Sequence, residues 1–135
     1  MSRRHIRVVG AMLEKEPGTY LITQRSKNAS LPLLWEFPGG RVNEGENDKD
    51  ALVRELHERL ELDVTVGESA MATHHVYPDY EVDFTVFFCA LKDAAQPVSH
   101  KRVNDHRWVR LDQMSEYQFP PADARTLEKL LELDH

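Results

Sequence analysis

The chain has 135 residues, of which 30% are charged and 41% hydrophobic, and its formal net charge is −6. This length predicts one domain, residues 1–135, with enough apolar surface for a core without disulfides. The acidic balance argues against duplex nucleic acid as a partner, because a phosphate backbone requires a basic face. The single cysteine, Cys89, excludes an internal disulfide and, within an apolar run, predicts a small buried side chain.

The sequence contains no apolar run that approaches the roughly 18 residues of a membrane span. The basic start, Met1–Arg7, has no long apolar stretch or cleavage site behind it. These features predict no secretory signal and no membrane partner. We therefore expect a cytoplasmic protein.

The first elements in chain order are two strands joined by a tight turn. Apolar residues over 6–13 and 19–24 predict the strands, and the proline and glycine between them favour the turn. Residues 26–34 are polar and then broken by proline, so we expect a loop that could lie over a pocket. The segment 35–40, Trp-Glu-Phe-Pro-Gly-Gly, is expected to end in a turn, because glycine adopts backbone angles closed to other residues.

A helix is predicted from the residue after Asn47 to about Leu60. Asn47 is a suitable N-cap, and the acidic residues Asp48 and Asp50 follow in the first turn, where the helix dipole favours negative charge. Leucines recur every four residues and predict an apolar stripe that faces the core; they are Leu52, Leu56 and Leu60.

The predicted helix also carries acidic residues at spacings of three and four. Glu55, Glu58 and the residue at position 59 are expected to share one outward face beside the leucine stripe. Between Glu44 and Asp63, eight acidic residues accompany only three basic ones. Carboxylate oxygens on a rigid helix suit a divalent cation. The glycine-led loop ahead of this helix favours a cation site over an ordinary solvated surface.

Two longer strands, a short strand and a second helix complete the chain. The longer strands are predicted at 63–74 and 81–91, with a turn at 77–80 between them. After a loop of mixed charge at 94–104, we expect a strand at 106–111 and a helix at 122–133. This order of elements predicts an α/β fold in which helices flank a mixed sheet.

The segment from Gly40 to Leu62 resembles the Nudix box, G-x5-E-x7-R-E-U-x-E-E-x-G-U with U apolar. This box is the signature of hydrolases that split nucleoside diphosphates linked to another group. Two positions differ from it: Arg59 stands where the second glutamate of the pair is expected, and Glu61 where glycine is expected. The resemblance implies a Nudix-type α/β/α sandwich with a mixed β-sheet. The matching residues are Gly40, Glu46, Arg54, Glu55, Leu56, Glu58 and Leu62.

The resemblance further implies a Mg²⁺ or Mn²⁺ ion held by Glu55, Glu58 and the backbone carbonyl of Gly39. Such an ion neutralises charge on phosphate oxygens and makes water nucleophilic. By the same resemblance, Arg54 would form an ion pair with Glu46 that fixes the loop to the helix. Glu55, Glu58, Arg54 and Glu46 are therefore the expected catalytic residues.

Arg59 leaves three arrangements open. A guanidinium is always protonated and cannot ligate a cation, so the ion could be held more weakly by Glu55, Glu58 and a carboxylate from elsewhere. Arg59 could instead bind phosphate directly in a bidentate way. It could also turn outward and pair with Glu55, four residues earlier.

Two further positions depart from the family pattern. Arg102 lies six residues before Trp108, where many members carry another metal-binding glutamate. Together with Arg59 it would replace carboxylates by fixed positive charge. Glu61 would end the helix in a left-handed conformation, which costs a residue other than glycine roughly 1 kcal/mol.

Outside the box, the chain is similar to the MutT branch, whose members hydrolyse nucleoside triphosphates, including oxidised guanine nucleotides, to the monophosphate and pyrophosphate. The resemblance implies that Arg25 contacts phosphate or sugar, that Phe37 lines the base pocket and that Asp123 meets the base edge. Arg59 is a further expected substrate-binding residue. The matching segments are Gln24-Arg25, Leu34–Gly40, Arg107–Val109 and Phe119–Asp123.

Two functions agree with these residues. The first is a metal-dependent Nudix hydrolase that cleaves a nucleoside triphosphate, with oxidised purine nucleotides such as 8-oxo-dGTP among the candidates, to monophosphate and pyrophosphate. The second is a nucleotide-binding protein of the same fold, catalytically weakened because Arg59 replaces a metal ligand. Both have a small-molecule nucleotide as partner, and we expect a monomer or a homodimer.

Overall fold

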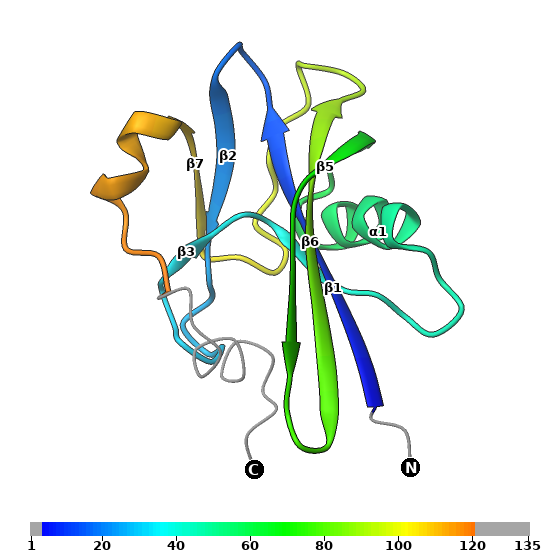
Figure 1. Cartoon of the computed structure of the whole chain (residues 1–135). Coiled ribbons are helices and arrows are strands. Elements are labelled where there is room, and N and C mark those ends of the chain that lie inside the picture. The colour runs from blue at the N-terminus through cyan, green and yellow to red at the C-terminus, as the bar shows by residue number, and fades with distance from the viewer. Residues whose placement is uncertain (1–3, 121–135) are drawn as a thin grey trace.

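A mixed seven-stranded sheet forms the centre of the fold, and helix α1 (Asp48–Leu60) packs on one of its faces (Figure 1). The computed structural model describes residues 4–120. The predicted α/β class with a mixed sheet is confirmed. The remaining elements are β1 (Arg4–Glu14), β2 (Thr19–Gln24), β3 (Trp35–Glu36), β4 (Gly39–Arg41), β5 (Val64–Val76), β6 (Tyr80–Leu91), β7 (Asp105–Arg110) and the 3₁₀ helix η1 (Leu111–Glu116).

Strand β1 joins the two halves of the sheet. Strand β6 runs parallel to it, from Arg4 opposite Tyr80 to Glu14 opposite Ala90, whereas β2 and β4 pair with it in the antiparallel direction. Strand β5 continues the sheet beyond β6, and both β3 and β7 pair with β2. Parallel neighbours require a long connection, and here that connection contains the glycine-led loop and helix α1.

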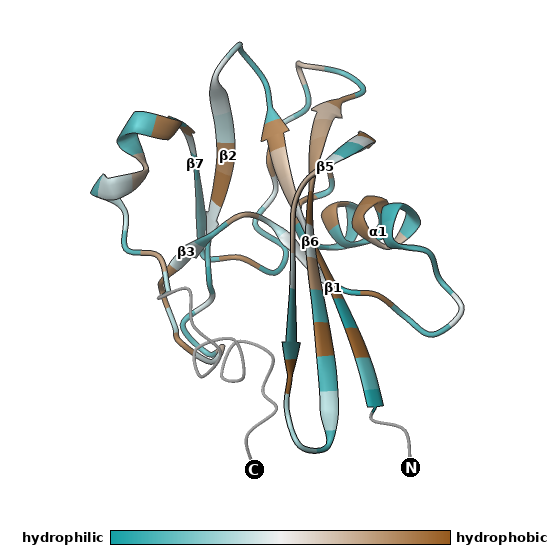
Figure 2. Ribbon diagram, viewed as in Figure 1, coloured by the Kyte–Doolittle hydropathy of each residue, from teal (hydrophilic) through white to brown (hydrophobic). Residues whose placement is uncertain are grey.

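Alternate residues of β1 supply two separate apolar clusters. Val9 and Leu13 pack with the leucine stripe of α1, while Ile6 and Val8 lie with Val82 on the opposite face. In Figure 2 the apolar colour of α1 alternates with polar colour along the helix, as expected for an amphipathic helix. The predicted stripe is confirmed, since its three leucines are fully buried; they are Leu52, Leu56 and Leu60.

Both ends of α1 have the predicted caps. The side-chain oxygen of Asn47 accepts a hydrogen bond from the backbone N–H of Asp50 at 2.9 Å. At the other end, Glu61 adopts the left-handed conformation, with φ 54° and ψ 36°. Its N–H donates to the carbonyl of His57 at 3.0 Å. A residue with a side chain therefore occupies a position that favours glycine.

Cys89 is buried in the cluster between α1 and the sheet, as predicted. Burial raises the pKa of its thiol to about 12, because the apolar surroundings disfavour the thiolate. The reactive form of cysteine is the thiolate. Cys89 is therefore a packing residue.

Several boundaries differ from the prediction. Two short strands, β3 and β4, lie within residues 35–41, where a turn at the glycines was expected. The glycines are in a strand because they pair with β1. Strand β5 extends two residues beyond the predicted end, and η1 was not predicted. The predicted turn at 77–80 is present, with the N–H of Tyr77 donating to the carbonyl of Tyr80.

The predicted helix at 122–133 and the predicted base contact Asp123 lie outside the described residues. The described part of the chain therefore shows one helical layer of the expected sandwich, which is α1. Within that same part, no helix has the length and apolar character needed to cross a membrane.

Candidate active site

The loop and the helix of the box meet where Gly40 faces Glu55. A Cβ atom added to Gly40 would lie only 2.3 Å from the carboxylate carbon of Glu55, so this position has no room for a side chain. The Glu55 side chain is only 9% exposed, while that of Glu58 is 40% exposed. The two glutamates lie together as predicted, since both accept from Nη1 of Arg54. The expectation that both face outward is wrong for Glu55, because Gly40 of β4 lies against it.

All five N–H groups of Arg54 donate hydrogen bonds, three to the loop and β4 and two to glutamates of α1. Nε and Nη2 donate to the two carboxylate oxygens of Glu46 at 2.9 and 3.0 Å, and Nη2 also donates to the carbonyl of Arg41. Nη1 donates to Glu55 at 3.0 Å and to Glu58 at 3.2 Å. The predicted ion pair between Arg54 and Glu46 is therefore present, and it holds both box glutamates of α1 in position.

This network changes the acidity of its members. The hydrogen bond to Glu46 is the main reason why the pKa of Arg54 lies above its ordinary value. The same contact, with a further hydrogen bond from the backbone N–H of Asn43, lowers the pKa of Glu46. Glu46 therefore stays ionised, and Arg54 stays charged, throughout the neutral range.

Arg59 pairs with Glu55, the third of the arrangements left open by the sequence. Its Nε donates to Oε2 of Glu55 at 2.7 Å. Because Arg54 contacts the other oxygen, both oxygens of Glu55 accept from guanidinium groups. Arg59 also acts on a second carboxylate: burial raises the pKa of Glu36, while the charges of Arg25 and then Arg59 oppose that rise.

Arg102 reaches the same end of the helix. Its Nη1 lies 3.9 Å from Oε2 of Glu58, and its backbone N–H donates to the carbonyl of Arg59 at 3.3 Å. Three guanidinium groups thus surround the two box glutamates Glu55 and Glu58. Fixed positive charge therefore lies beside both glutamates.

The donor set still fits a substrate-bridged divalent ion. Mg²⁺ keeps several waters and is commonly held by one or two carboxylates together with phosphate oxygens of the substrate. Glu55 and Glu58 supply two carboxylates that Arg54 aligns from one side. The charge of Arg59, whose Nε lies 2.7 Å from Oε2, opposes an ion at Glu55, so the fit improves when Arg59 has another partner.

Arg25 is engaged within its own loop. Nε donates to the carbonyl of Ser30 at 2.7 Å, Nη2 to the hydroxyl of Ser30 at 3.0 Å, and Nη1 to Glu36 at 3.1 Å. Its side chain is 13% exposed. In this state Arg25 shapes the loop over 26–34 and pairs with Glu36, a residue that sequence reasoning missed. The signal that could have found Glu36 is a lone acidic residue within the apolar Trp-Glu-Phe-Pro segment.

Phe37 lies in an aromatic region formed by two distant segments. Its ring centroid is 6.1 Å from that of Phe119, and Trp35 meets Tyr117 edge-on at 5.1 Å. The backbone N–H of Trp35 donates to the carbonyl of Gln118 at 2.9 Å. The structure thus brings Phe37 beside the segment that leads to position 123.

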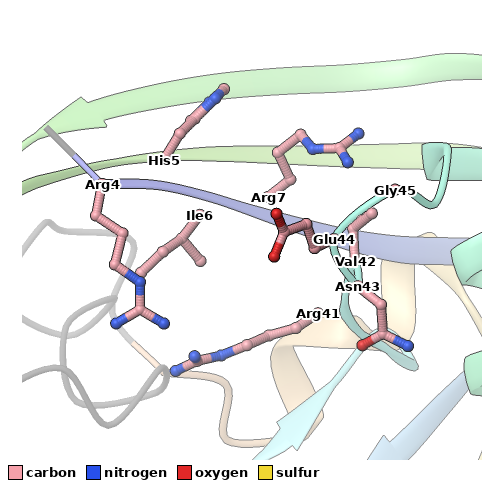
Figure 3. Close-up of a pocket in the computed structure, with 9 residues that line it drawn as sticks. All are labelled: Arg4, His5, Ile6, Arg7, Arg41, Val42, Asn43, Glu44 and Gly45. Carbon is pink, nitrogen blue, oxygen red and sulfur yellow. The ribbon is translucent and has the colours of Figure 1, made fainter. Parts of the chain in front are cut away.

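A basic pocket that the sequence did not predict opens beside the box loop. It has a volume of about 430 Å³ between the start of β1 and the segment after β4 (Figure 3). Arg4, Arg7 and Arg41 line it with Glu44. Arg7 donates to the carboxylate of Asp48 at 2.7 Å and to the carbonyl of Glu46 at 2.8 Å, so it connects the pocket to the box.

Comparison with known proteins decides the family. The model of the NUDIX domain matches residues 8–129. The chain belongs to the NUDIX family. A CTP pyrophosphohydrolase of Escherichia coli is 32% identical over 131 residues, which cover 95% of this chain and 93% of that protein. An 8-oxo-dGTP diphosphatase of Haemophilus influenzae is 29% identical over 135 residues, covering 100% of this chain and 98% of the relative.

Solved structures agree with this Nudix assignment. A solution structure of the E. coli ORF135 protein has a TM-score of 0.73 at 29% identity, covering 97% of this chain and 91% of that one. A MutT protein of Staphylococcus aureus has a TM-score of 0.63 at 34% identity, covering 98% and 100%. The predicted family, its MutT-like branch and the Nudix-type fold are confirmed, and the relatives support the predicted enzyme class, a pyrophosphohydrolase.

Proposed function

We propose that this Nudix protein hydrolyses a nucleoside triphosphate to the monophosphate and pyrophosphate with the help of a divalent metal ion. Nudix hydrolases generally require such an ion. The observation that carries the proposal is the Arg54 network, in which one guanidinium holds Glu46, Glu55 and Glu58 in a fixed arrangement. This arrangement supports hydrolysis because it sets two carboxylates side by side, as a divalent ion requires.

Glu55, Glu58 and the carbonyl of Gly39 would hold Mg²⁺ or Mn²⁺ in this proposal. The ion supplies neutralisation of phosphate charge and a more acidic water. Arg54 orients both carboxylates, and Glu46 in turn keeps Arg54 in place. The buried carboxylate of Glu55 is the one whose position is most restricted, because Gly40 lies directly against it.

Arg59 has a defined part in this proposal. Guanidinium groups bind phosphate oxygens through two parallel hydrogen bonds, so the triphosphate competes with Glu55 for Arg59. When Arg59 turns to the phosphate, Oε2 of Glu55 becomes available to the metal ion. Substrate and metal are therefore expected to bind together, each favouring the other.

The substrate contacts proposed from the family are Arg25 at phosphate or sugar, Phe37 at the base and Asp123 at the base edge. The names of the relatives support two kinds of base, an oxidised purine as in 8-oxo-dGTP and a cytosine as in CTP. We favour 8-oxo-dGTP as substrate, because several of the matched relatives are named 8-oxo-dGTP diphosphatase. A single cytoplasmic domain over residues 1–135, as monomer or homodimer, completes the proposal.

A second function is favoured by one observation, the hydrogen bond from Arg59 to Glu55. If this contact persisted with nucleotide bound, the metal site would stay closed. The protein would then bind a nucleotide and cleave it poorly.

Release of pyrophosphate from a panel of 8-oxo-dGTP, dGTP, dCTP and CTP, with Mg²⁺ or Mn²⁺, separates the two functions. We expect turnover by the natural chain, and a loss of about 10²–10³-fold in Glu55→Gln, because that change removes a metal ligand or base. Activity that appears only in Arg59→Glu would show that the natural chain is a binding protein. Activity of the natural chain that survives in Glu55→Gln would refute the assignment of Glu55.

A further inference from the structure

Two histidines and an aspartate come together at the start of β7, outside the Nudix box. Nε2 of His100 lies 2.8 Å from Nδ1 of His106 and 4.0 Å from Oδ1 of Asp105. One ligand atom from each of the three side chains lies within 4.8 Å of the other two. Among residues 4–120, this is the only group of three His, Cys, Asp or Glu side chains with that spacing.

The spacing is close to that of a metal centre. In a tetrahedral site with metal–ligand distances of roughly 2.0–2.1 Å, two ligand atoms lie about 3.3 Å apart. The two distances from Nε2 of His100, 2.8 Å to His106 and 4.0 Å to Asp105, fall on either side of that value. Changes of about 0.5 and 0.7 Å would bring the two distances to that value.

The carboxylate of Asp105 has a fixed orientation beside the two imidazoles. Asp105 is held in place, since its Oδ2 accepts from Arg107 at 2.7 Å and its Oδ1 from the backbone N–H of His106 at 2.8 Å.

The group lies at one end of a row of residues that crosses the sheet to Glu36. His106 stands opposite Thr23 of β2, and Thr23 stands opposite Glu36 of β3. Residues opposite one another in a ladder share a face and are neighbours, so the row runs from His106 to Glu36. The hydroxyl of Thr23 is buried and has no hydrogen-bond partner among the described residues, which leaves a polar group available beside His106.

The loop that carries His100 is fixed at both of its ends. Near its start, the N–H of Ser99 donates to the carbonyl of Leu60 at 3.0 Å, at the end of α1. At its far end, the N–H and the side-chain amide of Asn104 donate to Gln24 at 2.9 and 2.6 Å. Between these anchors the loop presents Arg102 to Glu58. A contact that holds His100 in place therefore also restrains Arg102, because the two residues lie in the same short loop.

We propose that His100, Asp105 and His106 form a second metal site, distinct from the Nudix box, that takes a borderline divalent ion such as Zn²⁺ and fastens the 99–104 loop to the edge of the sheet. Two imidazoles and one carboxylate suit Zn²⁺, Co²⁺ or Ni²⁺, whereas Mg²⁺ prefers oxygen ligands alone. The site is partly exposed, so water can supply a fourth ligand. By restraining the loop, the ion keeps Arg102 beside Glu58.

The test is a titration of the untagged protein, without nucleotide, by calorimetry with Zn²⁺ and by visible absorption with Co²⁺. We expect one ion per chain, the absorption of tetrahedral Co²⁺, and a higher Tm with Zn²⁺. His100→Ala and His106→Ala should each weaken binding by at least about tenfold, because each removes a ligand. His100 is partly exposed in a loop, so its variant tests the site even if His106→Ala is poorly folded.

The matched control is the double variant His5→Ala/His74→Ala. These histidines also flank an aspartate, Asp83, but they contact its two different oxygens and are not within metal-ligand spacing as a set. The control should bind Zn²⁺ with the affinity of the parent. The proposal is overturned if the parent binds no Zn²⁺, if both His100→Ala and His106→Ala keep the parental affinity, or if the control loses it.

A second measurement addresses the loop. Amide hydrogen exchange over residues 99–104 should slow on addition of Zn²⁺ in the parent and stay unchanged in His100→Ala. Equal slowing in both proteins would contradict the loop-fastening role. Neither measurement uses nucleotide turnover, so failure here is distinguishable from failure of the proposed hydrolase function.

Discussion

The two halves of the Nudix box differ in how their charges are matched. From Gly40 to Arg54 the box is a closed network, in which every N–H of Arg54 has an acceptor and Glu46 has matched donors. In the second half and the adjoining loop, Arg59 brings positive charge to Glu55, and Arg102 brings it to Glu58. We call Arg54 with its partners Glu46, Glu55 and Glu58 the frame. The second half of the box determines how readily the frame accepts a cation. The Arg54 network is thus complete in a chain that carries a positive charge at position 59.

The largest effect is expected from breaking the frame. Arg54→Met leaves Glu46 and Glu58 without their strongest partner and should lower the free energy of unfolding by about 2–3 kcal/mol, less than for a fully buried pair because Arg54 is partly exposed. Urea denaturation measures this change. Arg110→Met is the control, since Arg110 and Asp112 form an exposed pair worth less than about 0.5 kcal/mol. Equal losses in both variants would mean that the frame adds no stability.

The metal-binding half is tested by reversing its charge. Arg59→Glu frees Glu55 and adds a carboxylate, so the affinity for Mn²⁺ should rise by at least about tenfold, which corresponds to about 1.4 kcal/mol. Calorimetry without nucleotide measures it. Arg59→Gln, which only removes the positive charge, should lie between the parent and Arg59→Glu. An unchanged affinity in both variants would show that Arg59 does not restrain the metal site.

A smaller effect on stability is expected at the C-terminal end of α1, where Glu61 is the capping residue. Glu61→Gly should raise the free energy of unfolding by about 0.5–1 kcal/mol, because glycine adopts the left-handed conformation without strain. Glu61→Ala keeps the strain and serves as the control. The ion pair lost with Lys101 is long and exposed, so it contributes little. A gain in the alanine variant would assign the effect to the charge of Glu61.

The smallest expected effect is the pH dependence of the stability that Glu46 contributes. The folded pKa of Glu46 is lowered from 4.5, so its stabilising contribution is present above that value and is lost as pH falls through the folded pKa. Between about pH 5 and pH 3 the parent should therefore lose more stability than Glu46→Gln. Glu44→Gln is the control and should follow the parent. Thermal unfolding across this range measures the difference, and identical slopes for the parent and Glu46→Gln would contradict the assignment.

The sequence predicted the features that depend on local periodicity and on one motif. The leucine stripe, the Asn47 cap and the pairing of Arg54 with Glu46 follow from spacing within one segment or from the box itself. The family comparison then confirmed the class of enzyme. These features need no knowledge of how distant segments meet.

The features that escaped prediction depend on contacts between segments. Glu55 was expected to be exposed, and it is buried because β4 lies against its turn of the helix. Strands β3 and β4 are two and three residues long, too short for any periodicity to show. His100 and His106 are six residues apart and meet through the fold of the intervening loop, whose ends bond to Leu60 and Gln24. Asp123 and the second predicted helix stay predictions, since they lie outside the described residues.

The parallel pairing of β1 with β6 has a consequence for synthesis of the chain. Arg4 meets Tyr80 and Glu14 meets Ala90, so one whole side of the first strand has no backbone partner until residues up to Leu91 have left the ribosome. At roughly 5–20 residues per second, that wait lasts on the order of several seconds. A nascent chain arrested before β6 would expose an apolar strand edge, a natural target for chaperones and a risk for aggregation.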